Sequence, residues 1–435
     1  MKFAVITFGC RVNQADSLAA EVRLRALGAE PASPEQADVV LVNSCSVTST
    51  ADQGTRQAIR RAARDNPRAR VIVTGCYASR CPDEIRTLPG VARVVTNADK
   101  DALPDLIVAE FGGEAPTTRE RYDPDGDGPC GFRIGPGALG RTAFTLGVQT
   151  GCDEPCAYCI IPATRGSSRS RPLEWVVEQI DRACGAGYKD ITLTGVHLGA
   201  YGLDLRPRRT LAELLARAVE TDREVVVRIG SLEPMDCTPE VLDLVASSRR
   251  MAPAFHLPLQ HASDRLLRLM RRPYECGRYR ALVTDIRRRL PHASIGSDII
   301  VGFPGETDED FARLVAFLEA SPLTQLHVFP YSDRPGTEAS HLPGRVDGRI
   351  VRDRSRSIRE IGQRLSGSFR RQLAGTAHRA LVIDDGTSAV IPNGLRVRLP
   401  GRRPRNEWVD VRLEFEAESL RGEISAHAGS SVAAR

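Results

Sequence analysis

The chain has 435 residues, of which 41% are hydrophobic and 26% charged, a globular composition with room for roughly three domains. No apolar run approaches the roughly 18 residues of a membrane span. The start "MKFAVITFGC" lacks a secretory cleavage pattern, so we expect a cytoplasmic protein with no membrane partner. The net charge is +5 and nearly all basic residues are arginine, which permits a nucleic-acid partner without requiring one.

Residues 1–111 alternate short apolar runs with amphipathic helical patterns. Helical patterns at 14–27 and 50–65 separate the runs at 3–7, 39–42 and 71–74. This alternation predicts a doubly wound α/β domain with a parallel sheet. Residues 112–141 are rich in Gly, Pro and Asp and indicate a linker.

Residues 142–373 continue the strand–helix alternation on a larger scale. We predict strands near 144–149, 190–194, 225–229, 254–259, 294–301 and 325–329, and helices near 172–186, 210–221, 238–247, 263–290 and 307–320. Six units are too few for an eightfold barrel, so we expect a partial (β/α)6 barrel with its chemistry at the C-terminal strand ends. An Arg-rich helical pattern follows at 348–373.

The last part of the chain, 374–425, has short alternating runs punctuated by Gly, Pro and Asp. Such runs predict a small all-β barrel. Residues 426–435 have the composition of a disordered tail.

Three of the eleven cysteines, Cys152, Cys156 and Cys159, follow the first barrel strand with the spacing C-x3-C-x2-C. Clustered cysteines in a cytosolic protein indicate metal ligands or catalytic groups rather than disulfides. A structural zinc site would use four ligands, commonly as paired C-x2-C units, and no second pair lies nearby in the sequence. Thiolates also suit iron–sulfur clusters, and three of them leave one iron of a four-iron cluster open for substrate chemistry.

A second set of three cysteines lies in the N-terminal domain, where Cys10, Cys45 and Cys76 each follow one apolar run. Because the C-terminal ends of parallel strands form one crevice, we expect these thiols to converge. We therefore predict a second metal site with three thiolate ligands and one open position. Cys81 is interpreted as a bystander, and Cys130 in the linker has no obvious partner.

The pattern C-x3-C-x2-C, with Tyr158 before the third cysteine, resembles the radical S-adenosylmethionine (SAM) superfamily, in which SAM occupies the open iron. The stretches "GCRVNQ", "NSCSVT", "GCYA", "IPATRGSSRSRP" and "VFPYSDRPGTEA" resemble the radical SAM methylthiotransferases over nearly the whole chain. The resemblance implies a methylthiotransferase N-terminal domain (1–111) with an auxiliary cluster, a radical SAM core (142–373) and a TRAM-like RNA-binding domain (374–425).

Within that family, "TFGCRVNQADS", "NSCSVTSTAD" and "GVHLGAYG" look most like the tRNA N6-threonylcarbamoyladenosine methylthiotransferases. Those enzymes modify C2 of the adenosine just 3′ of the anticodon (tRNA position 37). The resemblance implies SAM and two 4Fe-4S clusters as cofactors: a catalytic one on Cys152, Cys156 and Cys159, and a sulfur-donating one on Cys10, Cys45 and Cys76. It also implies an electron donor such as flavodoxin or ferredoxin and iron–sulfur assembly proteins as partners.

Small or polar residues at successive strand ends are the expected contacts of SAM: Tyr158, Gly195, Ser231, Gln260, Asp298 and Gly302. Arginines after the cysteine loop and in the last domain are the expected contacts of the tRNA anticodon loop: Arg165, Arg169, Arg171, Arg396 and Arg398. The turn Pro392-Asn393-Gly394 departs from the family pattern, which carries an aromatic residue there, and this puts base stacking by that domain in doubt.

Two other functions remain open from the sequence. The same chemistry could act on isopentenyladenosine in tRNA or on an aspartate of a ribosomal protein. Alternatively, the chain could be a redox-sensing RNA-binding protein whose iron–sulfur clusters are regulatory.

Overall fold

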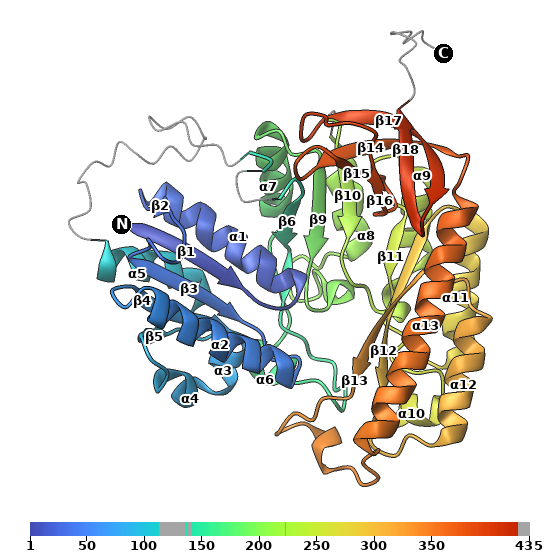
Figure 1. The fold of residues 1–435 in the computed structure, drawn as a ribbon, viewed down its shortest axis with the longest axis horizontal. Helices are drawn as coiled ribbons and strands as arrows, with labels where there is room; N and C mark the ends of the chain where they lie inside the picture. Colours follow the sequence, from blue (N-terminus) through green and yellow to red (C-terminus); the bar gives the residue numbers. More distant parts are fainter. Residues whose placement is uncertain (113–134, 138–140, 222, 425–435) are drawn as a thin grey trace.

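The N-terminal region of the computed structural model is a five-stranded parallel sheet in the order β2-β1-β3-β4-β5 (Figure 1). The described residues are 1–112, 135–137, 141–221 and 223–424, so most of the predicted linker, Cys130 and the predicted tail lie outside them. The elements of this region are β1 (Lys2–Thr7), α1 (Arg11–Ala26), β2 (Glu30–Pro31), β3 (Val39–Ser44), α2 (Ser49–Asp65), β4 (Arg70–Gly75), α3 (Cys76–Arg80), α4 (Pro82–Arg86), β5 (Val91–Val94), a 3-10 turn (Lys100–Ala102) and α5 (Leu103–Phe111).

Both faces of this sheet are covered. Leu24 of α1 and Ile107 of α5 pack on one face, while Ile59 of α2 and Tyr77 of α3 pack on the other. Strands buried on both sides are apolar along their whole length, which explains the run "VVLV" of β3. The predicted doubly wound α/β domain is confirmed.

The central region is a half-barrel of six parallel strands in two sheets, β6-β9-β10 and β11-β12-β13. Isolated bridges from Val227 to Met251 and from Ser231 to His256 join the two sheets. Its strands are β6 (Phe144–Gly147), β9 (Asp190–Thr194), β10 (Val226–Ile229), β11 (Ala254–His256), β12 (Ser294–Val301) and β13 (Gln325–Pro330), with a small ribbon of β7 (Gln149–Thr150) and β8 (Arg169–Ser170). The predicted partial barrel is confirmed.

Helices cover the outside of the half-barrel (Figure 1). They are α7 (Leu173–Gly185), α8 (Leu211–Val219), α9 (Pro239–Ser247), α10 (Asp264–Leu269), α11 (Cys276–Arg289), α12 (Asp308–Glu319) and α13 (Gly348–Gln372), while the short α6 (Ile161–Arg165) follows the cysteine loop. No helix in the described part of the chain is both long enough and apolar enough to cross a membrane.

One predicted helix, 263–290, is wrong, because the structure divides it into α10 and α11. Pro273 cannot donate a helical hydrogen bond, and a residue before proline is disfavoured in the helical conformation. Arg271 adopts a positive φ of 54° in the break. The interruption turns Arg272 away from the helical path, and this matters for the site described below.

The C-terminal region is a closed five-stranded barrel in the order β14-β15-β16-β18-β17, as expected. Its strands are β14 (Ala377–Ile383), β15 (Ser388–Val390), β16 (Arg396–Arg398), β17 (Trp408–Glu416) and β18 (Ser419–Ile424). The unusual turn Pro392-Asn393-Gly394 faces the half-barrel: Asn393 is 3% exposed and its Nδ2 donates to the carbonyl of His292 at 2.9 Å. Arg228 of β10 donates to the carbonyl of Pro392 at 2.7 Å. This turn therefore joins two regions, which accounts for its lack of an exposed aromatic ring.

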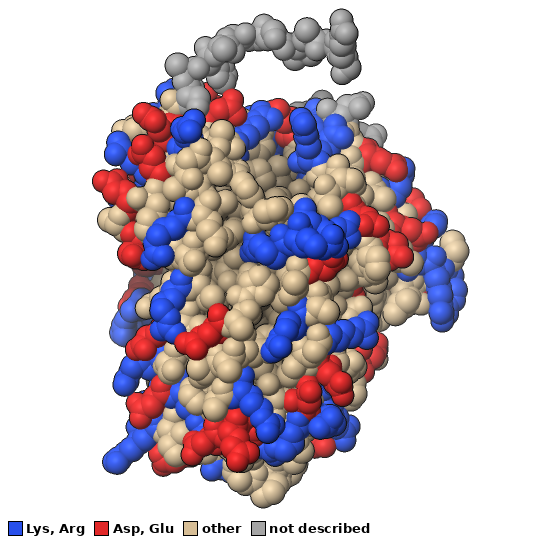
Figure 2. Space-filling model, turned by 90° about the vertical axis from the view of Figure 1, so that its right-hand side faces the viewer, with Lys and Arg blue, Asp and Glu red and all other residues tan. Residues whose placement is uncertain are grey.

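The arginines of α13 bind mainly the protein itself. Arg354 is buried and pairs with Glu306 at 2.6 Å and Asp308 at 2.5 Å, and Arg364 pairs with Glu319 at 2.8 Å. Figure 2 shows the face with α11, α12 and α13, where basic and acidic side chains are interspersed. The Arg-rich pattern of this helix is therefore largely a pattern of ion pairs within the fold.

Candidate active site

The loop that carries Cys152, Cys156 and Cys159 begins at a glycine that no other residue could replace without a shift of the chain. Gly151 has a φ of +74°, and a Cβ there would lie 1.9 Å from the carbonyl oxygen of Ser167. The buried amide of Gln149 donates to the Gly151 carbonyl at 2.8 Å. Farther along the loop, the Ala157 amide donates to Met270 at 3.1 Å and its carbonyl accepts from Ala339 at 2.8 Å. The loop is thus held at its start and in its middle.

The three thiols of this loop form one electrostatic group. Burial raises the pKa of Cys159 to about 12, and the neighbouring Cys156 and Cys152 also raise it. Metal binding would replace the thiol protons. Thiolates are the ligands of iron–sulfur clusters, and this loop offers three of them, Cys152, Cys156 and Cys159. The donor set therefore fits a cluster with one open iron.

Arg272 also contacts this loop, and the sequence analysis did not predict that contact. Its Nη1 lies 3.2 Å from the Cys156 sulfur, and its Nη2 pairs with Glu233. Its Nε donates to the Tyr274 hydroxyl at 3.1 Å. Only 2% of the Arg272 side chain is exposed, so a buried cation faces the ligand sulfur. The sequence does contain one indication of this contact: Pro273 interrupts the helix, so Arg272 can leave the helical path.

His197 approaches the loop from the opposite side. Its Nδ1 lies 3.9 Å from the Cys152 sulfur and its Nε2 lies 2.8 Å from Asp236. Burial lowers the pKa of His197, but the hydrogen bonds to Asp236 and Cys152 outweigh it and raise the pKa to about 10. Such outer partners orient ligands and tune a metal centre. Cys152 and Cys156 therefore each have a cationic neighbour.

The second set of cysteines lies at the C-terminal ends of β1, β3 and β4, as predicted. Cys45 and Cys76 are buried and Cys10 is exposed. The Cys45 sulfur fills the space beside Gly9, where a Cβ would lie 2.4 Å from it. Burial raises the pKa of Cys45 to about 12, and the charges of Cys10 and Cys76 contribute. These contacts bring the three thiols into one group, and this donor set also fits an iron–sulfur cluster.

Two asparagines connect the loops of the second set. Asn13 Nδ2 donates to the carbonyls of Phe8 and Ser44 at 2.8 and 2.9 Å, and Asn43 Nδ2 donates to the carbonyl of Asn13 at 2.8 Å. Buried amides with satisfied hydrogen bonds make such loops rigid. Both residues stand in the stretches "GCRVNQ" and "NSCSVT", whose local pattern does not predict this role.

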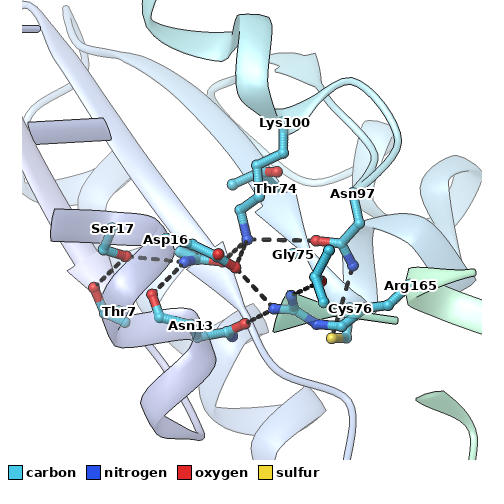
Figure 3. Close-up of polar contacts among 12 residues, drawn as sticks. Thr7, Asn13, Asp16, Ser17, Thr74, Gly75, Cys76, Asn97, Lys100 and Arg165 are labelled. Carbon is cyan, nitrogen blue, oxygen red and sulfur yellow. Dashed lines mark hydrogen bonds and ion pairs between the residues drawn. The ribbon is translucent and has the colours of Figure 1, made fainter. Parts of the chain in front are cut away.

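The prediction that Arg165 contacts RNA is wrong. Only 3% of its side chain is exposed, and its guanidinium crosses to the N-terminal region. There it donates to Asp16 at 2.8 Å and to Asn13 at 2.6 Å. Arg165 therefore joins the half-barrel to the N-terminal region (Figure 3).

A second buried contact joins the same two regions. Arg334, which follows β13, donates to Asp52 of α2 at 2.6 Å, and Arg80 donates to the same carboxylate oxygen at 2.7 Å. The other oxygen of Asp52 accepts from Ser46 at 2.8 Å, one residue after Cys45. Asp52 thus connects the loop that follows β3 to the half-barrel.

Asp298, an expected SAM contact, lies between two histidines on the inner side of β11, β12 and β13. His256 Nε2 and His327 Nδ1 donate to its Oδ1 at 3.0 and 3.1 Å. Burial would raise the pKa of Asp298, but these hydrogen bonds outweigh it and lower the pKa to about 2. The carboxylate is therefore ionised at neutral pH, and its Oδ2 has no hydrogen-bond partner among the described residues. The three side chains offer ligand atoms within 4.8 Å of one another.

Three further expected SAM contacts lie in the cysteine loop or at the strands of the half-barrel. Tyr158 packs edge-on against Phe303, with 6.5 Å between the ring centres. Gln260 has a φ of +64°, a conformation unusual for a residue with a side chain, and its backbone bridges to β12. Ser231 is exposed after β10, where it bridges to His256.

The two expected SAM glycines have packing reasons of their own. A Cβ at Gly195 would lie 2.8 Å from Oε1 of Gln149, and a Cβ at Gly302 would lie 2.4 Å from the side chain of Val351. The amide of Gly302 donates to Glu306 at 2.6 Å. Close packing therefore requires a glycine at both positions, whatever ligand the site holds.

The remaining expected RNA contacts are exposed, but most of them have partners. Arg171 pairs with Asp101 at 2.9 Å, Arg396 pairs with Asp384 at 2.7 Å, and Arg398 donates to Ser419 at 3.0 Å. Among the described residues, no group pairs with the side chain of Arg169.

The fold and the cysteine loop define a radical SAM protein. Residues 146–318 match the radical SAM superfamily, and residues 2–97 match the uncharacterized protein family UPF0004. The solved structure of the radical SAM methyltransferase TsrM from Kitasatospora setae is similar in fold, with a TM-score of 0.54 at 17% identity, over 78% of this chain and 76% of that one. Membership of the superfamily implies SAM and a 4Fe-4S cluster.

Comparison with curated relatives shows to which family of radical SAM proteins the chain belongs. The chain is 37% identical to threonylcarbamoyladenosine tRNA methylthiotransferase MtaB of Aquifex aeolicus, over 88% of this chain and 93% of that one. It is 34% identical to ribosomal protein uS12 methylthiotransferase RimO of Solibacter usitatus, over 98% and 91% of the two chains. It is 31% identical to tRNA-2-methylthio-N(6)-dimethylallyladenosine synthase of Mycobacterium bovis, over 87% and 76%. The chain belongs to the radical SAM methylthiotransferase family and is an enzyme.

Proposed function

We propose that this enzyme transfers a methylthio group to C2 of N6-threonylcarbamoyladenosine beside the anticodon of tRNA. A second 4Fe-4S cluster, on Cys10, Cys45 and Cys76, is the proposed sulfur source. One observation carries the proposal: two separate groups of three thiols lie in regions that buried ion pairs hold together, among them Arg165, which lies six residues after Cys159 and pairs with Asp16 in the N-terminal region. Two such groups provide one site for SAM cleavage and one for sulfur.

The side chains around the first thiol group have defined tasks in this proposal. When bound there, a four-iron cluster supplies the electron that cleaves SAM. Arg272 and the His197–Asp236 pair hold Cys156 and Cys152 in place and balance the charge of their thiolates. The unpartnered Oδ2 of Asp298 can accept a hydrogen bond from a ribose hydroxyl of SAM, with Ser231 and Gln260 as neighbouring contacts.

The proposed tRNA contact begins at Arg169. This arginine is exposed on β8, ten residues after Cys159, and its guanidinium has no partner among the described residues. A single-stranded anticodon loop can turn a base outward into a recessed site. Phosphates on either side of that base would then lie within reach of an exposed arginine beside the loop.

The substrate is tested by mass spectrometry of tRNA nucleosides. The chain is expressed in a host without its own methylthiotransferases, with Cys156→Ala as the inactive control. We expect the methylthio form of threonylcarbamoyladenosine to appear. Appearance of only the isopentenyl form, or methylthiolation of only a ribosomal protein, would replace the proposed substrate with that of another branch of the family.

The second cluster is tested by iron analysis after anaerobic reconstitution. Two four-iron clusters predict about eight irons per chain. Joint replacement of Cys10, Cys45 and Cys76 by alanine is expected to leave about four irons and to preserve the release of 5′-deoxyadenosine from SAM. An unchanged iron content in this variant would remove the proposed sulfur source.

A further inference from the structure

Arg11 directly follows Cys10, the exposed thiol of the second cysteine site, and is the first residue of α1. The next two residues, Val12 and Asn13, are buried, whereas Arg11 is exposed. Its guanidinium has no hydrogen-bond or ion-pair partner among the described residues. A permanently charged group beside the proposed sulfur source is therefore free to bind an anion.

Two other cations near this site already have a partner within the fold. Lys100 Nζ and Arg165 Nη2 each lie 2.8 Å from the same oxygen of Asp16, and Figure 3 shows these side chains turned toward one another. Asn97 lies between this buried group and the cysteines, with its Oδ1 3.4 Å from Lys100 Nζ and its Nδ2 3.8 Å from the Cys76 sulfur. These two cations therefore share a counter-ion that the protein itself supplies.

Arg11 lies close to the inner side of the half-barrel, because α1 packs against β6 and β9 (Figure 1). Burial lowers the pKa of Arg11, and the charge of Arg228 lowers it further, while that of Asp190 raises it. Ile191 and Val227 of the same two strands pack under the outer helices. Because side chains alternate along a strand, Asp190 and Arg228 point inward, where they pair with each other at 2.8 Å. Arg11 is thus recessed between the N-terminal region and the inner side of the half-barrel.

In the substrate proposed above, a carboxylate lies close to the carbon that reacts. Ring atom N1 is bonded both to C2, which accepts the methylthio group, and to C6, which bears the threonylcarbamoyl side chain through N6. When C2 lies at the second cysteine site, that side chain and its carboxylate lie beside the same cysteines. A guanidinium binds a carboxylate through two parallel hydrogen bonds, so Arg11 offers a matching group beside Cys10.

We propose that Arg11 is a specificity-determining residue, which pairs with the carboxylate of the threonylcarbamoyl side chain. This inference rests on the proposed function, because it takes both the substrate and the sulfur source from it. The isopentenyl side chain is apolar, so bound isopentenyladenosine would leave a recessed cation without a partner. Arg11 therefore favours one modified adenosine over the other.

A phosphate of the tRNA backbone is the other anion that an unpaired arginine could bind. A phosphate contact would strengthen the binding of every tRNA alike, because all of them carry the same backbone. A carboxylate contact strengthens only the binding of tRNA that carries the threonylcarbamoyl group. The two contacts therefore differ in whether Arg11 creates a preference for the modified tRNA.

The test compares two forms of the same tRNA, one with threonylcarbamoyladenosine at position 37 and one with unmodified adenosine there. Binding of each to the reconstituted full-length enzyme, with SAM and without a reductant, is measured by filter binding. We expect the wild type to prefer the modified tRNA, and Arg11→Gln to reduce this preference on the order of tenfold, the effect of a hydrogen bond between charged groups. Arg11→Lys keeps the charge and is expected to retain part of the preference. Arg60→Gln, at an exposed position of α2, is the control.

The outcomes separate this inference from the proposed function. If Arg11→Gln weakens the binding of both tRNAs equally, Arg11 contacts a phosphate and the inference is wrong; unchanged binding of both tRNAs also contradicts it. Loss of iron from Arg11→Gln would assign Arg11 to the cluster site and contradict the inference as well. If the wild type methylthiolates no tRNA that carries threonylcarbamoyladenosine, the proposed function fails. Methylthiolation by the wild type together with an undiminished preference in Arg11→Gln would overturn this inference alone.

Discussion

The two cysteine sites solve the same ligand problem in different ways. Cys152, Cys156 and Cys159 lie on one continuous loop, whereas Cys10, Cys45 and Cys76 come from the ends of three strands. The first site places single cationic side chains against individual sulfurs, Arg272 at 3.2 Å and His197 at 3.9 Å. The second site has its cations farther back, in a shared buried group behind Asn97.

This difference matches the tasks proposed for the two sites. Direct contacts on ligand sulfurs fix a cluster that must pass an electron to one bound molecule. A charged group set back from the sulfurs leaves room beside the exposed Cys10 for a ligand that must arrive and leave. The comparison thus predicts that changes at the first site affect SAM cleavage, and that changes at the second affect only the sulfur transfer.

The largest expected effect comes from single cysteine replacements. Cys156→Ala removes a ligand of the catalytic cluster, so we expect loss of both 5′-deoxyadenosine release and methylthio transfer. Cys76→Ala is expected to abolish methylthio transfer while 5′-deoxyadenosine is still released. Product analysis by chromatography measures both activities in one assay. Equal loss of both activities in the two variants would show that the sites do not divide the chemistry.

Arg272→Met tests the direct contact at the first site. The change removes the cation beside Cys156 and leaves Glu233 without its partner. Loss of an outer partner of a metal ligand typically costs about 10- to 100-fold in metal affinity or activity, so we expect a decrease of that size in 5′-deoxyadenosine release. The matched control is Arg268→Met, whose side chain is 69% exposed. A decrease of similar size in the control would assign the effect to general destabilisation.

We expect a residue of the half-barrel to make the folding stability of the protein sensitive to acid. His261 is completely buried, and burial lowers its pKa to about 4. The unfolded chain binds a proton near pH 6.5 that the folded chain refuses, so this stability is complete above about pH 6.5 and is lost as the pH falls toward 4. At about pH 5 the loss amounts to about 2 kcal/mol.

Urea unfolding of the wild type and of His261→Gln, at neutral pH and at about pH 5, measures this loss of stability. The variant lacks the titrating group, so its stability should decrease less between neutral pH and pH 5. The same decrease in both proteins would assign the acid sensitivity to other groups.

The smallest expected effect concerns Arg169. Arg169→Ala removes one candidate phosphate contact, so we expect tRNA affinity to decrease several-fold and the salt dependence of binding to become weaker by about one unit of slope. SAM cleavage without tRNA should be unchanged. Filter binding at several salt concentrations provides the measurement, with Arg60→Ala, on the outer face of α2, as a control. Unchanged affinity and slope would exclude Arg169 from the tRNA surface.

Much of the fold follows from local patterns in the sequence. Apolar runs that alternate with amphipathic segments predicted the doubly wound sheet, the half-barrel and the closed C-terminal barrel, because strand and helix periodicities are local properties. The split between α10 and α11 was missed although its cause, Pro273, is also local. Pro273 therefore marks in the sequence both the break in the helix and the residue, Arg272, that departs from it.

Both sets of thiols could be predicted from the amino-acid sequence: one from its spacing, the other from the rule that parallel strands end at one edge. The charges that face these thiols depend on how distant segments pack. Arg165 is beside the first set in sequence, yet the fold buries it against Asp16 and Asn13 of the other region. Lys100 reaches the same carboxylate from 84 residues away along the chain. Electrostatic partners act through space between distant segments, so no local pattern encodes them, and only the packed domains bring them together.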